Sequence, residues 1–168
     1  MIPTPRSIER PCNNVFIADS IDDLIYDVYE VLLNQPFNVT TTRGKTSELL
    51  VTTIQLNNPL ARISRSETRG KPFSALGELM WYLSKTNTLN FIEFYIKAYK
   101  NDCYDGKTIH GGYGPRLFKF RKGKINQVEN VIRLLSTRKS SRKAVIQLYD
   151  AEDLHKNHKE FPCTCTLQ

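Results

Sequence analysis

The chain is organised around residues 160–168, EFPCTCTLQ, where a cysteine directly follows a proline and opens an alternating, strand-like run. A proline donates no backbone hydrogen bond, so Pro162 favours a position for the next residue at the mouth of a strand rather than inside its ladder. That position suits a nucleophile, because a thiolate attacks electrophilic carbon well when nearby positive charge or a helix N-terminus lowers the pKa of the thiol. Cys163 is therefore a candidate catalytic nucleophile.

Two other interpretations of these cysteines stay open. Cysteines of intracellular proteins are most often small buried apolar residues. On a strand Cys165 would point the same way as Cys163, and His155 and His158 could fold back to complete a metal site. The pair lacks a second ligand pair at zinc-like spacing, so the sequence predicts no bound metal.

Length and composition limit the classes of protein to which this chain can belong. The chain has 168 residues, of which 40% are hydrophobic and 24% charged, which is ordinary for a soluble globular protein with one core. We expect a single domain over residues 1–168. A long apolar run and a signal-like N-terminus are both missing, which argues against a membrane-spanning or secreted protein. Four cysteines in a chain this long give no disulfide framework, so a reducing, cytoplasmic location is expected.

Positive charge is concentrated in one block. The net charge is +7, yet residues 116–143 hold ten Lys or Arg against one acid, Glu129, a local net charge of +9 that leaves about −2 for the rest. Such a block indicates a solvated face or a surface for anions, either phosphorylated small molecules or nucleic acid.

Apolar spacing and capping signals predict the main elements. Ser20 with Asp23, and Asn126 with Glu129, have the spacing of helix-capping pairs. A continuous apolar run over 144–149 predicts a strand buried on both faces. Together the patterns predict helices over 20–33, 73–83, 87–96 and from 126, and strands over 49–56, 144–149 and 164–168.

The predicted helix over 73–83 has two distinct faces. Glu78 and Trp81, three residues apart, share one of them, and an acid beside a tryptophan at the edge of a core is well placed to orient water or a substrate. Tyr95 and Tyr99 continue this aromatic edge. The other face is apolar and consists of Leu76, Leu79, Met80 and Leu83.

Two glycine-containing segments are candidate binding loops. Residues 43–47, RGKTS, could cradle a phosphate, although the P-loop spacing is absent and a plain turn is the alternative. Residues 111–116, GGYGPR, surround Tyr113 with three glycines, which permit close backbone approach and place the phenol on a tight loop. A plain turn is again the alternative.

In their order and spacing these motifs resemble the N-terminal half of thymidylate synthases and the related pyrimidine-nucleotide hydroxymethylases. The resemblance covers residues 43–168. It rests on an Arg-containing loop at 43, ELMW at 78–81, GYG at 112–114, SRK at 141–143 and PC at 162–163. It implies an α/β thymidylate synthase fold, with a mixed, mostly buried sheet flanked by helices and a homodimer formed through the sheet face.

The resemblance also implies catalytic roles. Cys163 would add to C6 of the pyrimidine of a 2′-deoxyuridylate-like nucleotide, which makes C5 nucleophilic toward the methylene of 5,10-methylenetetrahydrofolate. Glu78 would organise water and proton transfers, and Tyr113 would assist removal of the C5 proton. For folate, Trp81 and Tyr99 are the expected contacts, because the tryptophans that commonly precede the GYG segment are missing. Tyr104 is a further candidate.

For the nucleotide's phosphate, the resemblance implies Arg43 together with Arg142 and Lys143, a basic pair that reaches it across a two-fold dimer interface. The family usually has two arginines where this chain has Arg142 and Lys143, and many synthases have a histidine where it has Thr164. The last predicted strand stops without a cap, so a truncated chain is expected. The groups that read the pyrimidine edge would then lie beyond Gln168.

The function expected from this resemblance is reductive methylation of dUMP to dTMP. The alternative within the family is hydroxymethylation of dCMP, CMP or dUMP. An alternative from another class is a nucleic-acid-binding module that uses residues 116–143, where Phe118 and Phe120 are the only interleaved aromatics. A catalytically inactive structural piece is a third possibility.

Overall fold

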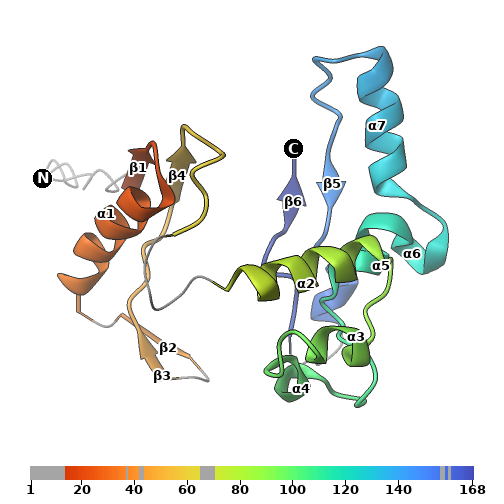
Figure 1. Ribbon diagram of the computed structural model, residues 1–168, viewed down its shortest axis with the longest axis horizontal. Coiled ribbons are helices and arrows are strands. Elements are labelled where there is room, and N and C mark those ends of the chain that lie inside the picture. The colour runs from red at the N-terminus through yellow and green to blue at the C-terminus, as the bar shows by residue number, and fades with distance from the viewer. Residues whose placement is uncertain (1–13, 37, 42–43, 65–70, 156–157, 159) are drawn as a thin grey trace, which may run out of the picture. The chain divides into compact units, whose positions relative to one another are not determined.

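A computed structural model describes residues 14–36, 38–41, 44–64, 71–155, 158 and 160–168. The chain forms two compact units, residues 1–70 and 71–168. Figure 1 shows helices with small sheets, the mixed α/β composition that the sequence predicts. The prediction that residues 1–168 make one domain stays a prediction.

The first unit is built on a capped helix, α1 (Ile21–Leu33). Ser20 Oγ accepts a hydrogen bond from the backbone N–H of Asp23 at 3.2 Å and donates one to the Asp23 carboxylate at 2.6 Å. This arrangement satisfies a first-turn N–H and places negative charge at the positive end of the helix. The predicted start of the helix is confirmed.

Two short strand pairs accompany α1. Strand β1 (Asn14–Ala18) runs parallel to β4 (Thr52–Leu56), and β2 (Val39–Thr41) pairs antiparallel with β3 (Gly44–Thr46). The strand predicted over 49–56 is therefore confirmed for its second part. The loop predicted over 43–47 is corrected, since Gly44–Thr46 forms a strand, and Arg43 lies outside the described residues.

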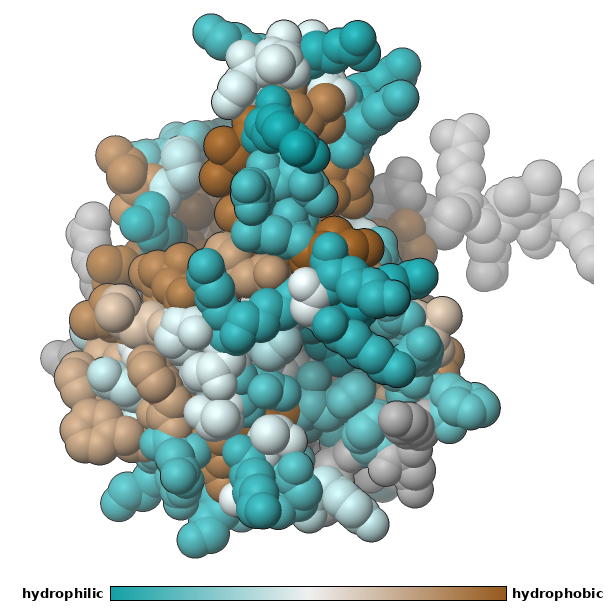
Figure 2. Space-filling model, turned by 90° about the vertical axis from the view of Figure 1, so that its right-hand side faces the viewer, coloured by the Kyte–Doolittle hydropathy of each residue, from teal (hydrophilic) through white to brown (hydrophobic). Residues whose placement is uncertain are grey.

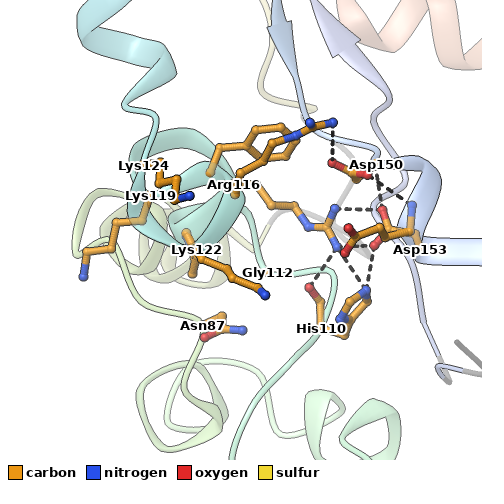
Figure 3. A pocket seen from close by; sticks show the side chains of 13 residues that line it. Asn87, His110, Gly112, Arg116, Lys119, Lys122, Lys124, Asp150 and Asp153 are labelled. Carbon is orange, nitrogen blue, oxygen red and sulfur yellow. Dashed lines mark hydrogen bonds and ion pairs between the residues drawn. The ribbon is translucent and has the colours of Figure 1, made fainter. Parts of the chain in front are cut away.

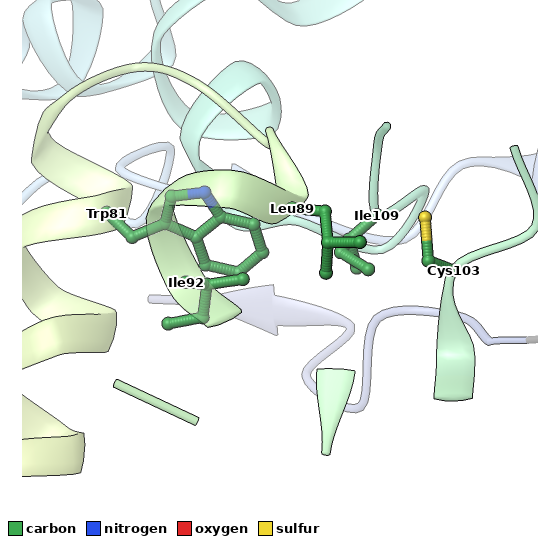
Figure 4. Packing of buried hydrophobic residues seen from close by; sticks show 5 residues of the cluster. All are labelled: Trp81, Leu89, Ile92, Cys103 and Ile109. Carbon is green, nitrogen blue, oxygen red and sulfur yellow. The ribbon is translucent and has the colours of Figure 1, made fainter. Parts of the chain in front are cut away.

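The second unit has a small core between α2 (Pro72–Leu83), α3 (Leu89–Glu93) and the segment that follows α4 (Tyr99–Asp102). Figure 4 shows its five buried residues in contact: Trp81, Leu89, Ile92, Cys103 and Ile109. Burying apolar side chains of this size contributes about 1.5–3 kcal/mol each. This cluster fixes the helix that also carries Glu78.

The apolar face predicted for α2 is not buried. Its four members are between 49% and 53% exposed, and the helix packs instead through Gly77 and Trp81, which are one turn apart. The reason is the glycine, because a Cβ on Gly77 would lie 2.2 Å from the ring of Tyr95. The aromatic ring therefore closes against this side of the helix. Figure 2 shows such hydrophobic side chains at the surface among hydrophilic ones.

The GYG segment is a helix start rather than a loop, which corrects the prediction. Gly112 is the N-cap of α5 (Tyr113–Phe118), so Tyr113 opens the helix. Pro115 is tolerated there because the first-turn N–H groups of a helix have no intrahelical partner. Close approach is the reason for Gly114, since its Cβ would lie 2.4 Å from the carbonyl oxygen of Thr86.

This contact predicts a strong effect of Gly114→Ala. Alanine favours a helix by about 1 kcal/mol, but its methyl group would strike backbone that no rotamer change can move. We expect a net loss of about 1–3 kcal/mol in the free energy of unfolding, measured by urea denaturation. Gly106→Ala gives the cost of backbone strain without a clash, about 1–2 kcal/mol, since its φ is +69° and nothing lies within 4 Å of an added Cβ. A Gly114→Ala protein as stable as the wild type would contradict the expectation.

The remaining elements hold the C-terminal segment. The tight turn α6 (Phe120–Gly123) precedes α7 (Gln127–Thr137), whose predicted cap is confirmed because Asn126 Oδ1 accepts from the N–H of Glu129 at 3.1 Å. Strand β5 (Ile146–Gln147) pairs antiparallel with β6 (Thr166–Leu167), and the 3₁₀ helix η1 (Ala151–Leu154) lies between them in sequence.

The strand predicted over 144–149 is shorter than expected and is not buried on both faces. Val145 is 40% exposed, whereas Leu148 is buried. The buried amide of Gln127 completes the strand from the side, accepting from the N–H of Gln147 at 2.9 Å and donating to its carbonyl at 2.7 Å. Strand β5 is thus flanked by one strand, β6, and by the side chain of Gln127. The sheet buried on both faces that the apolar run predicted does not form here.

Candidate functional site

Cys163 is an exposed free thiol at the centre of the site. It follows the buried Pro162 and precedes β6, which begins only at Thr166, so the cysteine lies before the strand as the sequence predicts. The strand itself is shorter than the predicted 164–168. Cys165 is exposed too, but its carbonyl accepts the N–H groups of Leu148 and Tyr149 at 2.8 and 3.1 Å.

Two hydrogen bonds tie the segment around Cys163 to the GYG segment. The N–H of Thr164 donates to the phenol oxygen of Tyr113 at 3.1 Å. Three residues before the cysteine, Glu160 Oε1 accepts from the N–H of Gly111 at 2.7 Å. The thiol is therefore held between two anchors on the same partner segment, and the phenol of Tyr113 lies at the residue next to it.

Tyr113 is itself held by an aromatic neighbour. Its ring stacks on that of Tyr82, with centroids 5.0 Å apart and planes inclined by 28°. Burial raises the pKa of Tyr82 to about 12, and the charge of the nearby Glu78 raises it further. Tyr82 thus lies beside both Glu78 and Tyr113.

Glu78 belongs to the same group of side chains. Its Oε1 accepts a short hydrogen bond, 2.5 Å, from the phenol of Tyr99, and its side chain is partly buried. Burial raises the pKa of Tyr99 well above its ordinary range, and the hydrogen bond to Glu78 raises it further. Tyr99 therefore stays protonated and keeps the carboxylate of Glu78 in place as an acceptor. The structure brings Cys163, Glu78 and Tyr113 into one region.

A buried ion pair supports the helix that carries Tyr113. Arg116, one turn along α5, donates from Nη1 and Nη2 to the two carboxylate oxygens of Asp153 at 2.8 and 2.7 Å. It also donates to the carbonyls of Leu148 and His110 at 2.7 and 3.1 Å. Burial alone would raise the pKa of Asp153, but its hydrogen bonds with Arg116, the N–H of Asp150 and the His110 ring lower it to about 2. The carboxylate is ionised at neutral pH.

Comparison with known proteins identifies the relatives of this arrangement. The model of a family described as thymidylate synthase matches residues 31–168. The chain belongs to the thymidylate synthase family. The resemblance drawn from the ordered motifs is thereby confirmed, and so is the α/β thymidylate synthase fold.

Two curated relatives of this thymidylate synthase family chain are viral. A deoxyuridylate hydroxymethyltransferase of Pseudomonas phage M6 is 29% identical over 115 residues, which are 67% of this chain and 32% of the relative. A protein with the same name from Delftia phage PhiW-14 is 32% identical over 79 residues, which are 46% of this chain and 21% of that relative. The chain thus spans a third or less of the length of the curated relatives it matches.

Of the three residues predicted to bind phosphate in this thymidylate synthase family chain, the structure describes Arg142 and Lys143. Arg142 and Lys143 are exposed on a turn before β5, and neither forms an ion pair within the described residues. The carbonyl of Arg142 accepts from the side-chain amide of Gln168 at 3.1 Å. Arg43 lies outside the described residues, so whether it joins them stays a prediction.

The predicted folate contacts differ in their surroundings. Trp81 is 1% exposed and belongs to the core, with the Tyr99 ring edge-on to it at 5.5 Å. Tyr99 is half-buried, and Tyr104 is 79% exposed. Contact between Trp81 and folate stays a prediction, and it requires the indole to become uncovered.

Within the described residues, no three His, Cys, Asp or Glu side chains are grouped as metal ligands, so the alternative of a metal site at Cys163, Cys165, His155 and His158 gains no support. None of the described helices is long and apolar enough to cross a membrane.

Three sets of contacts around the candidate site were not predicted from the sequence. Tyr82 follows directly on the recognised ELMW motif, and its stacking on Tyr113 had no sequence signal. Glu160 precedes the PC motif by two residues, and its bond to Gly111 joins segments 49 residues apart. The pairing of Arg116 with Asp153 spans 37 residues. A signal for Asp153 did exist, because Asp150 and Asp153 form a capping box at the start of η1.

Proposed function

We propose that the protein transfers a one-carbon unit to C5 of a 2′-deoxyuridylate, using Cys163 as the covalent nucleophile at C6. The observation that carries the proposal is the hydrogen bond between the Thr164 N–H and the phenol of Tyr113, which joins the exposed thiol's segment to a candidate proton acceptor. Membership of the thymidylate synthase family supports the same chemistry.

In the proposed reaction the Cys163 thiolate forms a bond to C6 of the ring, and the electron pair displaced from the C5–C6 double bond makes C5 nucleophilic. C5 then attacks the methylene carbon of 5,10-methylenetetrahydrofolate, the co-substrate. In this proposal Tyr113 helps to remove the C5 proton afterwards, either directly or through water. The bond between Cys163 and C6 then breaks as the C5–C6 double bond re-forms, which releases the product and the thiolate.

Glu78 orders water and proton transfers around the ring in this proposal. Its partner Tyr99 and the neighbouring Tyr82 have raised pKa values, so both remain protonated near neutral pH. Tyr99 therefore serves as a hydrogen-bond donor that orients the Glu78 carboxylate, and Tyr82 supports the Tyr113 ring by stacking on it, so neither acts as a base. A partly buried carboxylate with one oxygen already bound by Tyr99 also suits the N–H donors of a folate ring.

Hydroxymethylation of dUMP is the form of the reaction that the relatives favour, because both are named deoxyuridylate hydroxymethyltransferases. In this form water completes the reaction and the folate leaves as tetrahydrofolate. Reductive methylation to dTMP is the second candidate, favoured by the description of the matching family. In that form the folate supplies a hydride and leaves as dihydrofolate.

Product analysis separates the two forms. The protein, with any residues that flank this chain retained, is incubated with dUMP and 5,10-methylenetetrahydrofolate, and both products are identified by mass spectrometry. Hydroxymethyl-dUMP with tetrahydrofolate supports the proposal, whereas dTMP with dihydrofolate supports the second candidate. No change at C5 with dUMP, dCMP or CMP would contradict both.

The proposed phosphate role of Arg142 gives a further prediction. Arg142→Ala should weaken binding of dUMP by about 1.5–3 kcal/mol, the value of a lost charge-assisted contact, and leave deoxyuridine almost unaffected. The measurement is a binding titration with both ligands. Arg138→Ala is the matched control, because Arg138 is also exposed and its loss changes the net charge by the same amount. Equal losses for dUMP and deoxyuridine would reject the phosphate role.

The resemblance places this basic pair across a homodimer interface, and we retain that arrangement as part of the proposal. If it holds, mixing Arg142→Ala protein with Cys163→Ser protein should restore part of the activity. Each mixed dimer would then contain one site with both groups intact.

A further inference from the structure

The second unit contains a pocket whose lining includes Gly112 and Pro115, close in sequence to Tyr113. It has a volume of about 440 Å³ and is bounded by α5, the α6 turn and η1 (Figure 3). Neither Cys163, Glu78 nor Tyr113 lines it. Its size falls within the range of about 300–1,000 Å³ that is usual for small-molecule sites.

Unpaired positive charge lines this pocket. Two of its acids are already engaged, since Asp153 pairs with Arg116 at 2.7 Å and Asp150 with Arg121 at 3.7 Å. The lining also contains three lysines and one further acid, the exposed Glu152. None of the three lysines makes an ion pair within the described residues. These lysines are Lys119, Lys122 and Lys124.

The backbone that presents these lysines is strained. Arg121, Lys122 and Gly123 have φ values of 49°, 60° and 82°, three successive residues in the left-handed region. Non-glycine residues there cost about 1–2 kcal/mol each. Reciprocal hydrogen bonds between the backbones of Phe120 and Ile125, at 2.8 and 3.1 Å, hold the turn closed. In Figure 3 the side chain of Lys122 extends toward Asn87 across the pocket.

The buried residue Arg116 forms part of the lining. Both of its terminal nitrogens are hydrogen-bonded within the protein, so Arg116 holds the wall of the pocket in place. Pro115 and Phe120 add an apolar wall beside it.

We propose that this pocket binds a phosphorylated small molecule of about nucleotide size, separate from the pyrimidine nucleotide at Cys163. Phosphate oxygens would accept hydrogen bonds from the three lysines, while Pro115 and Phe120 contact the rest of the ligand. The concave shape favours a small ligand over nucleic acid, for which cations follow an extended surface. The inference does not depend on the reaction proposed above.

The test uses the protein, with any residues that flank this chain retained, and ATP as the probe, with pyrophosphate as a probe without a ring. Isothermal titration should give saturable binding of both. The triple variant Lys119→Ala, Lys122→Ala, Lys124→Ala should weaken ATP binding at least about 100-fold, since each charge-assisted contact is worth about tenfold. The matched control is Arg133→Ala, Arg138→Ala, Lys139→Ala, which removes the same charge from exposed positions outside the pocket and should change it less than about threefold.

Four results would overturn the proposal. They are the absence of saturable binding, equal weakening in both triple variants, loss of binding in an Arg142→Ala, Lys143→Ala variant, and a preference for single-stranded DNA with steep salt dependence. The third result would assign the probe to the candidate dUMP site. Cys163→Ser should bind ATP like the wild type, so failure of the catalytic proposal and failure of this one can be told apart.

Discussion

Replacing Cys163 with serine should lower turnover of dUMP at least about 1,000-fold, because a hydroxyl is a far weaker nucleophile than a thiolate and no other group of the site can take its place. Nucleotide binding should remain measurable, since serine has nearly the same shape as cysteine. The hydrogen bond to the Tyr113 phenol is donated by the backbone N–H of Thr164 and does not involve the Cys163 side chain. The measurements are a turnover assay and a dUMP titration on the same preparation.

Cys165→Ser is the matched control for that experiment. Cys165 is exposed like Cys163, and its contacts with Leu148 and Tyr149 are made through its carbonyl oxygen, which serine retains. Turnover of the control should stay within about threefold of the wild type, as for a residue without a chemical role. Cys163→Ser protein with more than a tenth of wild-type turnover would disprove the assignment of the nucleophile.

Replacing Asp153 with alanine should destabilise the protein by about 3–5 kcal/mol, because it leaves the charge of Arg116 buried and unpaired. Both side chains are nearly inaccessible, and the pair also holds the carbonyls of Leu148 and His110 around the same guanidinium. Urea denaturation at pH 7 measures the loss. Glu152→Ala, one residue earlier but exposed, should cost less than about 0.5 kcal/mol.

The same pair predicts an acid sensitivity with a defined sign. The pKa of Asp153 falls from 3.8 to about 2 on folding, so its contribution is complete above pH 4 and is lost as the pH falls through 2. A shift of this size corresponds to about 2 kcal/mol. The unfolding free energy of the wild type should therefore drop more between pH 5 and pH 2 than that of Asp153→Asn. Equal drops would show that Asp153 is not ionised in the fold.

Local chemistry explains what the sequence could predict. The cap of α1 by Ser20 and that of α7 by Asn126 depend on side chains within three residues, so their patterns were sufficient. The catalytic candidates were found because the motifs that contain them occur in a recognisable order. Glycines 111, 112 and 114 were assigned to close backbone approach, and their contacts agree with that assignment.

The features that the sequence did not predict depend on distant partners. Leu76 and Leu79 have the spacing of a buried stripe, yet the side of α2 that packs is decided by Gly77 against Tyr95, 18 residues away. The partners of Glu160 and Asp153 are likewise unrelated to any local pattern. A helix start at Tyr113 was misjudged as a loop because glycine and proline usually signal turns, whereas a first helical turn accepts both.

The position of Trp81 allows its fluorescence to report on the candidate site. It is the single tryptophan of this chain, and its ring lies 5.8 Å from that of Tyr82, which stacks on Tyr113, and 5.5 Å from that of Tyr99, which binds Glu78. A buried indole emits at shorter wavelength than a hydrated one, and tyrosines at this separation transfer excitation to it efficiently. Its fluorescence would thus follow the loading and release of ligand beside these rings in real time, without an attached dye.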